Sequence, residues 1–204
     1  MTSEVAERLL DNFVFRIASF HGFTRIESLR YGCPKHDATA MLSFPFRVSS
    51  RGSGLFTMWV GLRFESLAPW LEDDRTKTRP TFVRPIHFLR ENRTYTEWEF
   101  SNAENLEKLK DAILSDFQRY ALPFAERYSE LTELRKTVED VKASVSIGID
   151  VDRRVLILAA MKLVEGDRAG ALKTLDLALL ERATAFPKRR YAMEYLRKKI
   201  TGQV

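Results

Sequence analysis

The longest regular pattern of apolar side chains runs from Ser101 to about Asp140 and predicts one long amphipathic helix. Its apolar residues recur at spacings of three and four, which places them on one face of a helix. They are Leu106, Leu109, Ile113, Phe117, Tyr120, Phe124, Tyr128, Leu131, Leu134, Val138 and Val141. Ser101 and Glu104 have the spacing of a capping box at the start of this helix. Pro123 lacks an amide hydrogen, so we expect the helix to kink there and then continue.

Shorter patterns before this helix predict another helix and a set of antiparallel strands. Residues 4–20 have a helical period and end at His21-Gly22, where the glycine can adopt a left-handed cap. Alternating apolar and polar side chains then indicate five strands, over residues 24–31, 39–48, 55–65, 81–89 and 94–100. We expect one hairpin around residues 49–54 and a second around residues 90–93. Pro45 indicates an edge position or a bulge in the second strand.

The last third of the chain predicts helices only. Residues 143–150 are expected to be a joint, followed by a helix over 153–165 that Gly166 closes. Asp167 can cap the next helix, and Pro187 suits the first position of a last one.

The order of these elements is typical of an α+β protein. We expect an α+β domain over residues 1–142, with an antiparallel sheet of about five strands. The N-terminal helix and the long kinked helix should pack on this sheet. Residues 143–204 should form a C-terminal extension made of a helical hairpin plus one helix.

Composition narrows the class of protein. The chain has 204 residues, of which 45% are hydrophobic and 30% charged, as in an ordinary globular protein that needs no disulfide staples. No apolar run approaches the roughly 18 residues of a membrane span. The start, Met1-Thr2-Ser3-Glu4, lacks the basic and apolar segments of a signal peptide. The single cysteine, Cys33, excludes an internal disulfide framework, so we expect a cytoplasmic protein.

Positive charge is concentrated toward the C-terminus. The net charge is +5, and residues 151–204 alone carry 12 basic and 6 acidic side chains. The basic residues of the last predicted helix are Lys188, Arg189, Arg190, Arg197, Lys198 and Lys199. Such a cluster can contact phosphates, although a charged helix is usually a solvated face. A nucleic-acid partner therefore stays open as an alternative.

A second basic region surrounds a long polar connection over residues 66–80. Loops of this length are often functional or disordered. Arginine and tryptophan together favour a protein interface, and we expect the partner to be a protein with an acidic surface. The expected partner-binding residues are Trp70, Arg75, Lys77, Arg79, Arg84 and Arg93.

Catalytic candidates are few. Cys33 and His36 have a Cys-x-x-His spacing, which would suit a nucleophile with a base or two zinc ligands, but a polar loop explains them as well. Glu97 and Glu99 share a predicted strand face with Tyr95, and paired carboxylates can do acid/base chemistry, but simple exposure also explains them.

Two further patterns do not by themselves indicate a catalytic or a phosphate-binding site. His87 shares the predicted strand face of Val83 and Pro85 without an identifiable orienting carboxylate. The glycines of residues 51–54 precede a strand and not a helix, unlike those of a phosphate-binding loop. We therefore expect no enzyme, no cofactor and no metal.

Three short segments suggest a family. They are Gly22-Phe23 at the end of the first helix, Trp59-Val60-Gly61-Leu62 in the third strand, and Tyr120-Ala121-Leu122-Pro123-Phe124 in the long helix. Over about residues 5–135 the chain resembles a family of bacterial domains of unknown function that occurs among candidate immunity proteins of polymorphic-toxin loci. The resemblance implies a stoichiometric, non-enzymatic binder that blocks a toxin or effector. The alternative is a nucleic-acid-associated accessory protein that uses the basic residues of 188–199.

Overall fold

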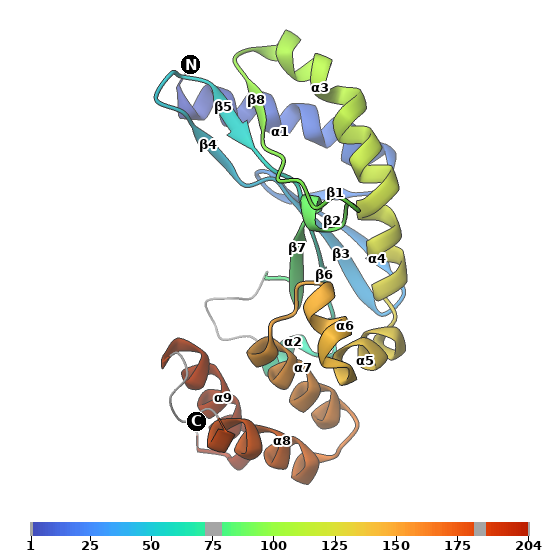
Figure 1. Cartoon of the computed structure of the whole chain (residues 1–204), viewed down its shortest axis with the longest axis vertical. Helices are drawn as coiled ribbons and strands as arrows, with labels where there is room; N and C mark the ends of the chain where they lie inside the picture. Colours follow the sequence, from blue (N-terminus) through green and yellow to red (C-terminus); the bar gives the residue numbers. More distant parts are fainter. Residues whose placement is uncertain (1, 72–78, 182–186, 204) are drawn as a thin grey trace. The chain divides into compact units, whose positions relative to one another are not determined.

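A computed structural model describes residues 2–71, 79–181 and 187–203, with side chains from residue 190 onward in the last range. It has the expected α+β fold, with a five-stranded antiparallel sheet, an N-terminal helix and several C-terminal helices (Figure 1). Contacts divide the chain into two compact units. The first unit comprises residues 1–62 and 83–130, and the second comprises residues 63–82 and 131–204. The expected division into a domain over residues 1–142 and an extension over residues 143–204 stays a prediction.

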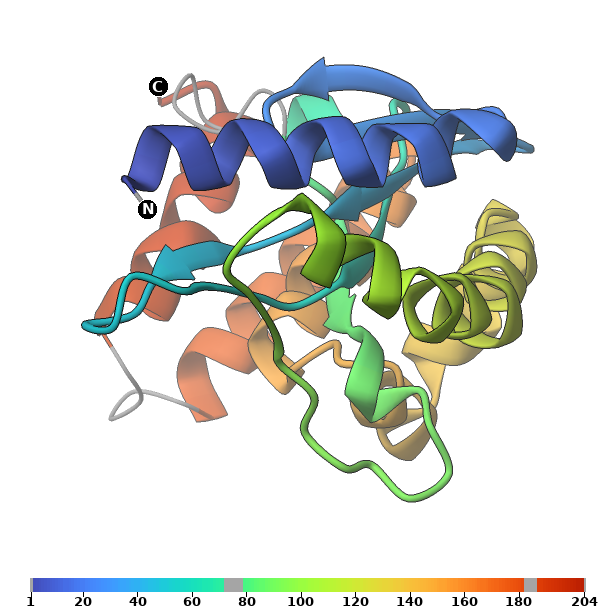
Figure 2. The same ribbon diagram turned by 90° about the horizontal axis from the view of Figure 1, so that it is seen from above.

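The first unit opens with α1 (Ser3–Phe20), as predicted. The Thr2 hydroxyl caps this helix by accepting a hydrogen bond from the Val5 amide. Gly22 follows the helix with a φ of 81°, a left-handed conformation that glycine adopts without strain. The buried face of α1 holds Leu10, Phe13, Val14 and Ile17. Figure 2 shows α1 beside α3 and the β4–β5 hairpin, with which it is in contact.

The strands form two sheets. The larger has the order β1 (Thr24–Glu27), β2 (Arg30–Lys35), β3 (Ala38–Ser43), β6 (Trp59–Arg63) and β7 (Phe82–Pro85). The smaller has the order β4 (Phe46–Val48), β5 (Gly54–Phe56) and β8 (Trp98–Phe100). Each of the first three predicted strands is divided in two, and Pro45 lies at the break between β3 and β4. The hairpin around residues 49–54 is confirmed, with Arg47 opposite Leu55.

The second predicted hairpin is wrong. β7 lies beside β6 in the larger sheet, whereas β8 pairs with β5 in the smaller one, with Leu55 opposite Glu99. The chain leaves the strand after Pro85 because residues Ile86–Phe88 form the 3-10 helix η1. β8 is instead held by aromatic packing, since the ring of Phe56 lies 5.4 Å from that of Trp98 and 5.9 Å from that of Phe100.

The long kinked helix is present but shorter than predicted: it is a continuous series from residue 103 to residue 128, and residues 131–139, which were expected to continue it, form a separate helix after a break at residues 129–130. It comprises α3 (Ala103–Asp116), the π-helix η2 (Phe117–Ala121) and α4 (Leu122–Tyr128). A π-turn directly before Pro123 is a recognised cause of a kink. The expected capping box is wrong: Asn102 is the cap and accepts from the Asn105 amide at 2.9 Å, while Ser101 donates to the Asn105 side chain.

In the described part of the second unit the regular elements are helices, apart from Arg63 of β6 and Phe82 of β7. It contains α2 (Ala68–Leu71), α5 (Leu131–Glu139), α6 (Val141–Ser146), α7 (Val151–Val164), α8 (Arg168–Glu181) and α9 (Pro187–Thr201). The expected joint is shorter than predicted because α6 extends to Ser146. Asp167 caps α8 as predicted, with its carboxylate accepting from the Gly170 amide at 2.8 Å.

The apolar core of the second unit lies where α7, α8 and α9 contact one another. Its buried residues are Val155, Leu156, Ala159, Ala171, Leu175, Ala178, Met193, Leu196 and Ile200. Among the described ranges, no helix combines the length and the apolar character that crossing a membrane would require.

Candidate functional site: a cationic and aromatic surface on residues 84–95

The segment after β7 belongs to the first unit and has a fixed backbone. The Ile86 amide donates to the carbonyl of Met58 at 2.8 Å, which attaches η1 to the residue directly before β6. The amides of Leu89 and Arg93 donate to the carbonyls three residues before them, at 2.9 Å and 3.1 Å. Arg93 itself has a φ of 48°, which is uncommon for a residue with a side chain. The segment therefore turns tightly instead of continuing as a strand.

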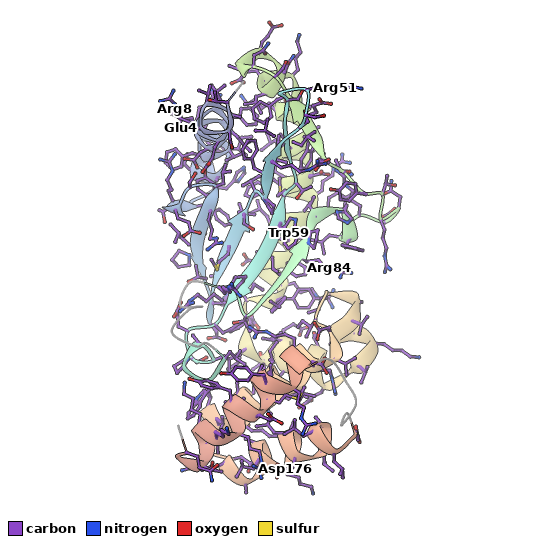
Figure 3. The ribbon with its side chains drawn as sticks, turned by 90° about the vertical axis from the view of Figure 1, so that its left-hand side faces the viewer. Glu4, Arg8, Arg51, Trp59, Arg84 and Asp176 are labelled. Carbon is purple, nitrogen blue, oxygen red and sulfur yellow. The ribbon has the colours of Figure 1, made fainter. Side chains whose placement is uncertain are left out.

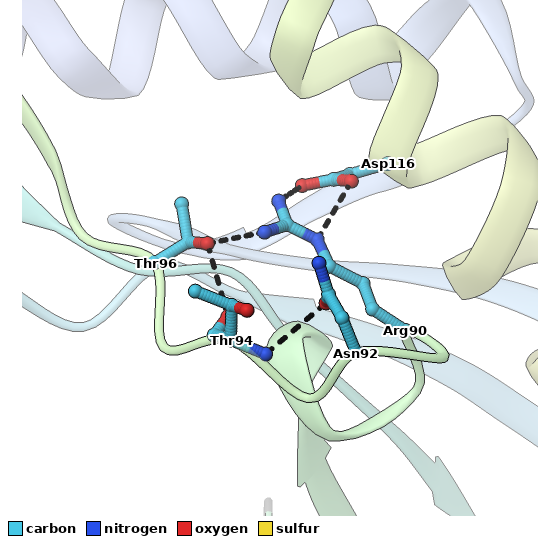
Figure 4. A network of polar contacts seen from close by, with 5 residues as sticks. All are labelled: Arg90, Asn92, Thr94, Thr96 and Asp116. Carbon is cyan, nitrogen blue, oxygen red and sulfur yellow. Dashed lines mark hydrogen bonds and ion pairs between the residues drawn. The ribbon is translucent and has the colours of Figure 1, made fainter.

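An ion pair anchors this segment to α3 (Figure 4). The guanidinium of Arg90 donates to both carboxylate oxygens of Asp116, with an Nε to Oδ1 distance of 3.1 Å, and also to the Thr96 hydroxyl. Asn92 accepts from the Thr94 amide at 3.1 Å, and Thr96 donates to the Thr94 carbonyl at 3.3 Å. The side chains of Arg90 and Asp116 are only 19% and 9% exposed. Bidentate pairing in such a partly dry place fixes geometry as well as charge.

Arg84 projects from β7 and is half-buried (Figure 3). Its guanidinium carbon lies 4.3 Å from the centre of the Phe88 ring, which is a cation–π arrangement. Burial lowers the pKa of Arg84, and the positive charge of Arg93 lowers it further. The side chain nevertheless stays charged at neutral pH because the guanidinium group is effectively always protonated in proteins. The charge of Arg93 is thus close enough to act on the partly desolvated Arg84 guanidinium.

His87 lies beneath the aromatic part of this surface. It belongs to η1 and is 7% exposed, so the prediction that it shares a strand face with Val83 and Pro85 is wrong. Its ring lies 4.3 Å from Phe88 and 5.0 Å from Tyr95, centre to centre. Burial lowers the pKa of His87, and the charges of Arg84 and Arg90 add to this effect. The imidazole is therefore neutral at pH 7 and acts as a packing element.

We use the name 84–95 surface for Arg84, Phe88, Arg93 and Tyr95. Phe88 and Tyr95 are 40% and 62% exposed, and Arg93 is exposed as well. Arginine and tyrosine are enriched among the residues that dominate protein–protein binding energies. Aromatic rings also bury a large area at a small cost in conformational entropy. Chemically, this surface can pair with carboxylates and cover apolar side chains.

The other expected partner-binding residues lie elsewhere. Trp70 is on α2 of the second unit, where it is half-buried and packs against the apolar core of that unit. Arg79 also belongs to the second unit and is exposed. Arg75 and Lys77 lie outside the described residues. Of the expected set, the structure brings together Arg84 and Arg93.

Cys33 and His36 have different neighbours. The Cys33 thiol is buried on β2, with its sulfur 3.6 Å from the Pro34 carbonyl oxygen. His36 instead lies 3.1 Å from one carboxylate oxygen of Glu126, and Lys35 lies 3.0 Å from the other. Lys35, followed by His36, lowers the pKa of Glu126 by hydrogen bonding to its charged form. The contacts found for the His36 imidazole and for the Cys33 thiol are therefore with different groups, a carboxylate and a main-chain carbonyl.

Glu97 is engaged by an arginine. Arg47 donates to its two carboxylate oxygens at 3.3 Å and 2.9 Å, and this contact raises the pKa of Arg47. Glu99 is exposed on β8. The described residues contain no group of three or more histidine, cysteine, aspartate or glutamate side chains arranged to hold a metal ion.

Several basic side chains of α9 already have partners within the second unit. Arg190 pairs with Glu194 and Arg197 pairs with Asp176, each at 2.7 Å, and Lys199 donates to the carbonyl of Pro69. The side chains of Lys188 and Arg189 lie outside the described residues. Positive charge that is already paired contributes less to the release of counterions from a phosphate backbone.

Comparison with protein-family models, with curated proteins and with solved structures found no match to this chain. The expected partner-binding set lacked two members of the 84–95 surface, Phe88 and Tyr95. The available signal for Phe88 was Pro85, which disfavours a continuing strand and puts Arg84 and Phe88 within one turn of each other.

Proposed function

We propose that the protein is a non-enzymatic binding protein that forms a stoichiometric complex with a protein partner through the 84–95 surface. The partner presents an acidic patch to Arg84 and Arg93. The observation that carries this proposal is the Arg84 guanidinium stacked on Phe88 beside a second arginine and the exposed ring of Tyr95. An immunity-type inhibitor that blocks a bacterial toxin or effector is the form of this function that the family resemblance implies.

The arrangement suits tight binding for two physical reasons. Arg84 has already lost part of its hydration, so pairing it with a carboxylate costs less further desolvation than pairing a fully hydrated side chain would. Its position over Phe88 also restricts its rotamers before binding, which reduces the entropy lost in the complex. The Arg90–Asp116 pair holds the supporting backbone in place.

A capture experiment tests this function. The tagged protein is expressed in its native host, and the bound material is analysed by mass spectrometry and by nuclease-sensitive absorbance at low and high salt. The baits are the unchanged chain, an Arg84→Glu/Arg93→Glu variant and a matched Arg51→Glu/Arg119→Glu variant. The matched variant makes the same charge change at two exposed arginines of the first unit.

We expect one protein at near-equal amount with the unchanged and matched baits, and its loss with the Arg84→Glu/Arg93→Glu bait. Nucleic acid that is released at high salt would instead support the alternative of a nucleic-acid-associated accessory protein. The absence of any protein that distinguishes the two variants would contradict the proposal. Circular dichroism of each bait checks that the fold is retained.

A further inference from the structure

A pocket lies where α1 and α3 meet, within the first unit, and none of its lining residues belongs to the 84–95 surface. Its volume is about 270 Å³. Its walls come from α1, from His21 directly after it, and from Lys110 and Leu114 on α3. Figure 2 shows the two helices side by side, and they are in contact. Since a water molecule takes up about 30 Å³ of liquid, the pocket has room for a ligand of roughly ten non-hydrogen atoms.

Apolar side chains form most of the wall. Phe13 and Ile17 are 3% and 9% exposed and belong to the buried face of α1. Phe20, at the last turn of the helix, is 86% exposed. A phenylalanine with this exposure loses unfavourable contact with water when a ligand covers it. The pocket therefore favours a ligand with an aliphatic or aromatic body.

The polar part of the wall is cationic. Arg16 is paired with Glu107, whereas Lys110 forms no ion pair with any described residue. The His21 ring is held by edge contacts with Phe20 and Phe117, at centre distances of 5.3 Å and 4.9 Å. The Nε2 atom of His21 is buried and has no hydrogen-bond partner in the part of the chain that the structure describes. A buried polar atom of this kind is stabilised by a ligand that can hydrogen-bond to it.

We propose that this pocket binds a small amphipathic carboxylate, with its apolar body against Phe13, Ile17 and Phe20. The carboxylate is placed beside Lys110. Because Glu107 already balances the charge of Arg16, one unpaired lysine matches a ligand with a single negative charge. An inorganic anion would leave the apolar wall in contact with water, and a neutral ligand would not form an ion pair with Lys110.

Octanoate, which has ten non-hydrogen atoms, is the probe. It is titrated into the full-length protein and followed by NMR shifts of the methyl groups of Ile17 and Leu114. Octanol serves as the neutral control and acetate as the control without an apolar body. The test variant is Lys110→Glu, and the matched variant is Lys108→Glu, which changes an exposed lysine of α3 that does not line the pocket.

We expect saturable octanoate binding with a Kd of about 0.1 to 1 mM, the range for a ligand of this size. Lys110→Glu should weaken it about tenfold or more, and Lys108→Glu by less than about threefold. Acetate should not shift the methyl signals. The inference is overturned if octanoate does not saturate, if octanol binds equally well, or if the two variants have the same effect. None of these results depends on the 84–95 surface.

Discussion

Arg90 donates hydrogen bonds to both carboxylate oxygens of Asp116, and this pair joins the connection after β7 to the helix α3. The two residues are 26 positions apart in the chain and belong to different elements. The arginine also reaches the Thr96 hydroxyl, so one side chain fixes both ends of the turn that displays Arg93 and Tyr95. The shape of the 84–95 surface thus depends on a contact outside it.

Removing one partner of this ion pair should destabilise the first unit. Asp116→Ala leaves the Arg90 charge partly buried without its carboxylate, and we expect the free energy of unfolding to fall by about 3 kcal/mol. Urea denaturation of Asp116→Ala, Arg90→Met and the double variant measures the effect. The double variant should lose clearly less than the sum of the two single losses. Strictly additive losses would show that the pair is not coupled.

His87 should make stability depend on pH on the acidic side of neutrality. Its pKa is lowered in the folded state, so below pH about 6.5 the unfolded chain takes up this proton more readily than the folded chain. The stabilisation is present above that pH and is lost as the pH falls toward the folded-state pKa. His87→Phe should flatten the profile of unfolding free energy between pH 7.5 and 5.5, whereas His36→Gln should not remove this component. A profile that is unchanged by His87→Phe would contradict the prediction.

The sequence predicted the locally encoded elements well. α1 and its glycine end, the Asp167 cap of α8 and the start of α9 at Pro187 all follow from residues within one or two helical turns. The partner of β8 was predicted wrongly because strand pairing depends on distant residues. Here Phe100 packs against Phe56 on β5, and no pattern within residues 81–100 carries that information.

The candidate site was predictable only in its charges. Arg84 and Arg93 were expected from their place in a basic region, but the role of Phe88 depends on the 3-10 turn that follows Pro85. Trp70 has the composition of an interface anchor, and only tertiary structure shows what it packs against. The charge of a region can thus be predicted from the sequence. The packing of a cation against its neighbours, in contrast, depends on the fold.

Trp70 should matter for stability and not for partner binding. Trp70→Ala removes a half-buried ring from the apolar core of the second unit, and we expect a loss of about 2 kcal/mol of unfolding free energy. Thermal unfolding measures this loss, and binding of the captured partner at a temperature where the variant is folded should stay within about threefold. If Trp70→Ala abolished binding without changing stability, the prediction would be wrong and Trp70 would be a partner-binding residue.

Gly54 should tolerate no side chain while Phe100 keeps its position. A Cβ atom at residue 54 would lie 2.4 Å from Cε1 of the Phe100 ring, so Gly54→Ala must displace that ring from the β5–β8 contact. We expect a loss of about 1 to 3 kcal/mol, as for other overpacked cores. Placing Gly54→Ala in a Phe100→Leu background should cost clearly less. Equal costs in the two backgrounds, measured by urea denaturation, would exclude the clash as the cause.

The most direct test of the central claim is the affinity of the purified partner for charge-reversed variants, measured by titration calorimetry at about 0.15 M salt. Arg84→Glu/Arg93→Glu should weaken binding by about 100-fold or more, because two attractive contacts with an acidic patch become repulsive. Arg51→Glu/Arg119→Glu, with the same change in net charge, should weaken it by less than about fivefold. Equal affinities for these two variants would show that the partner does not bind at the 84–95 surface.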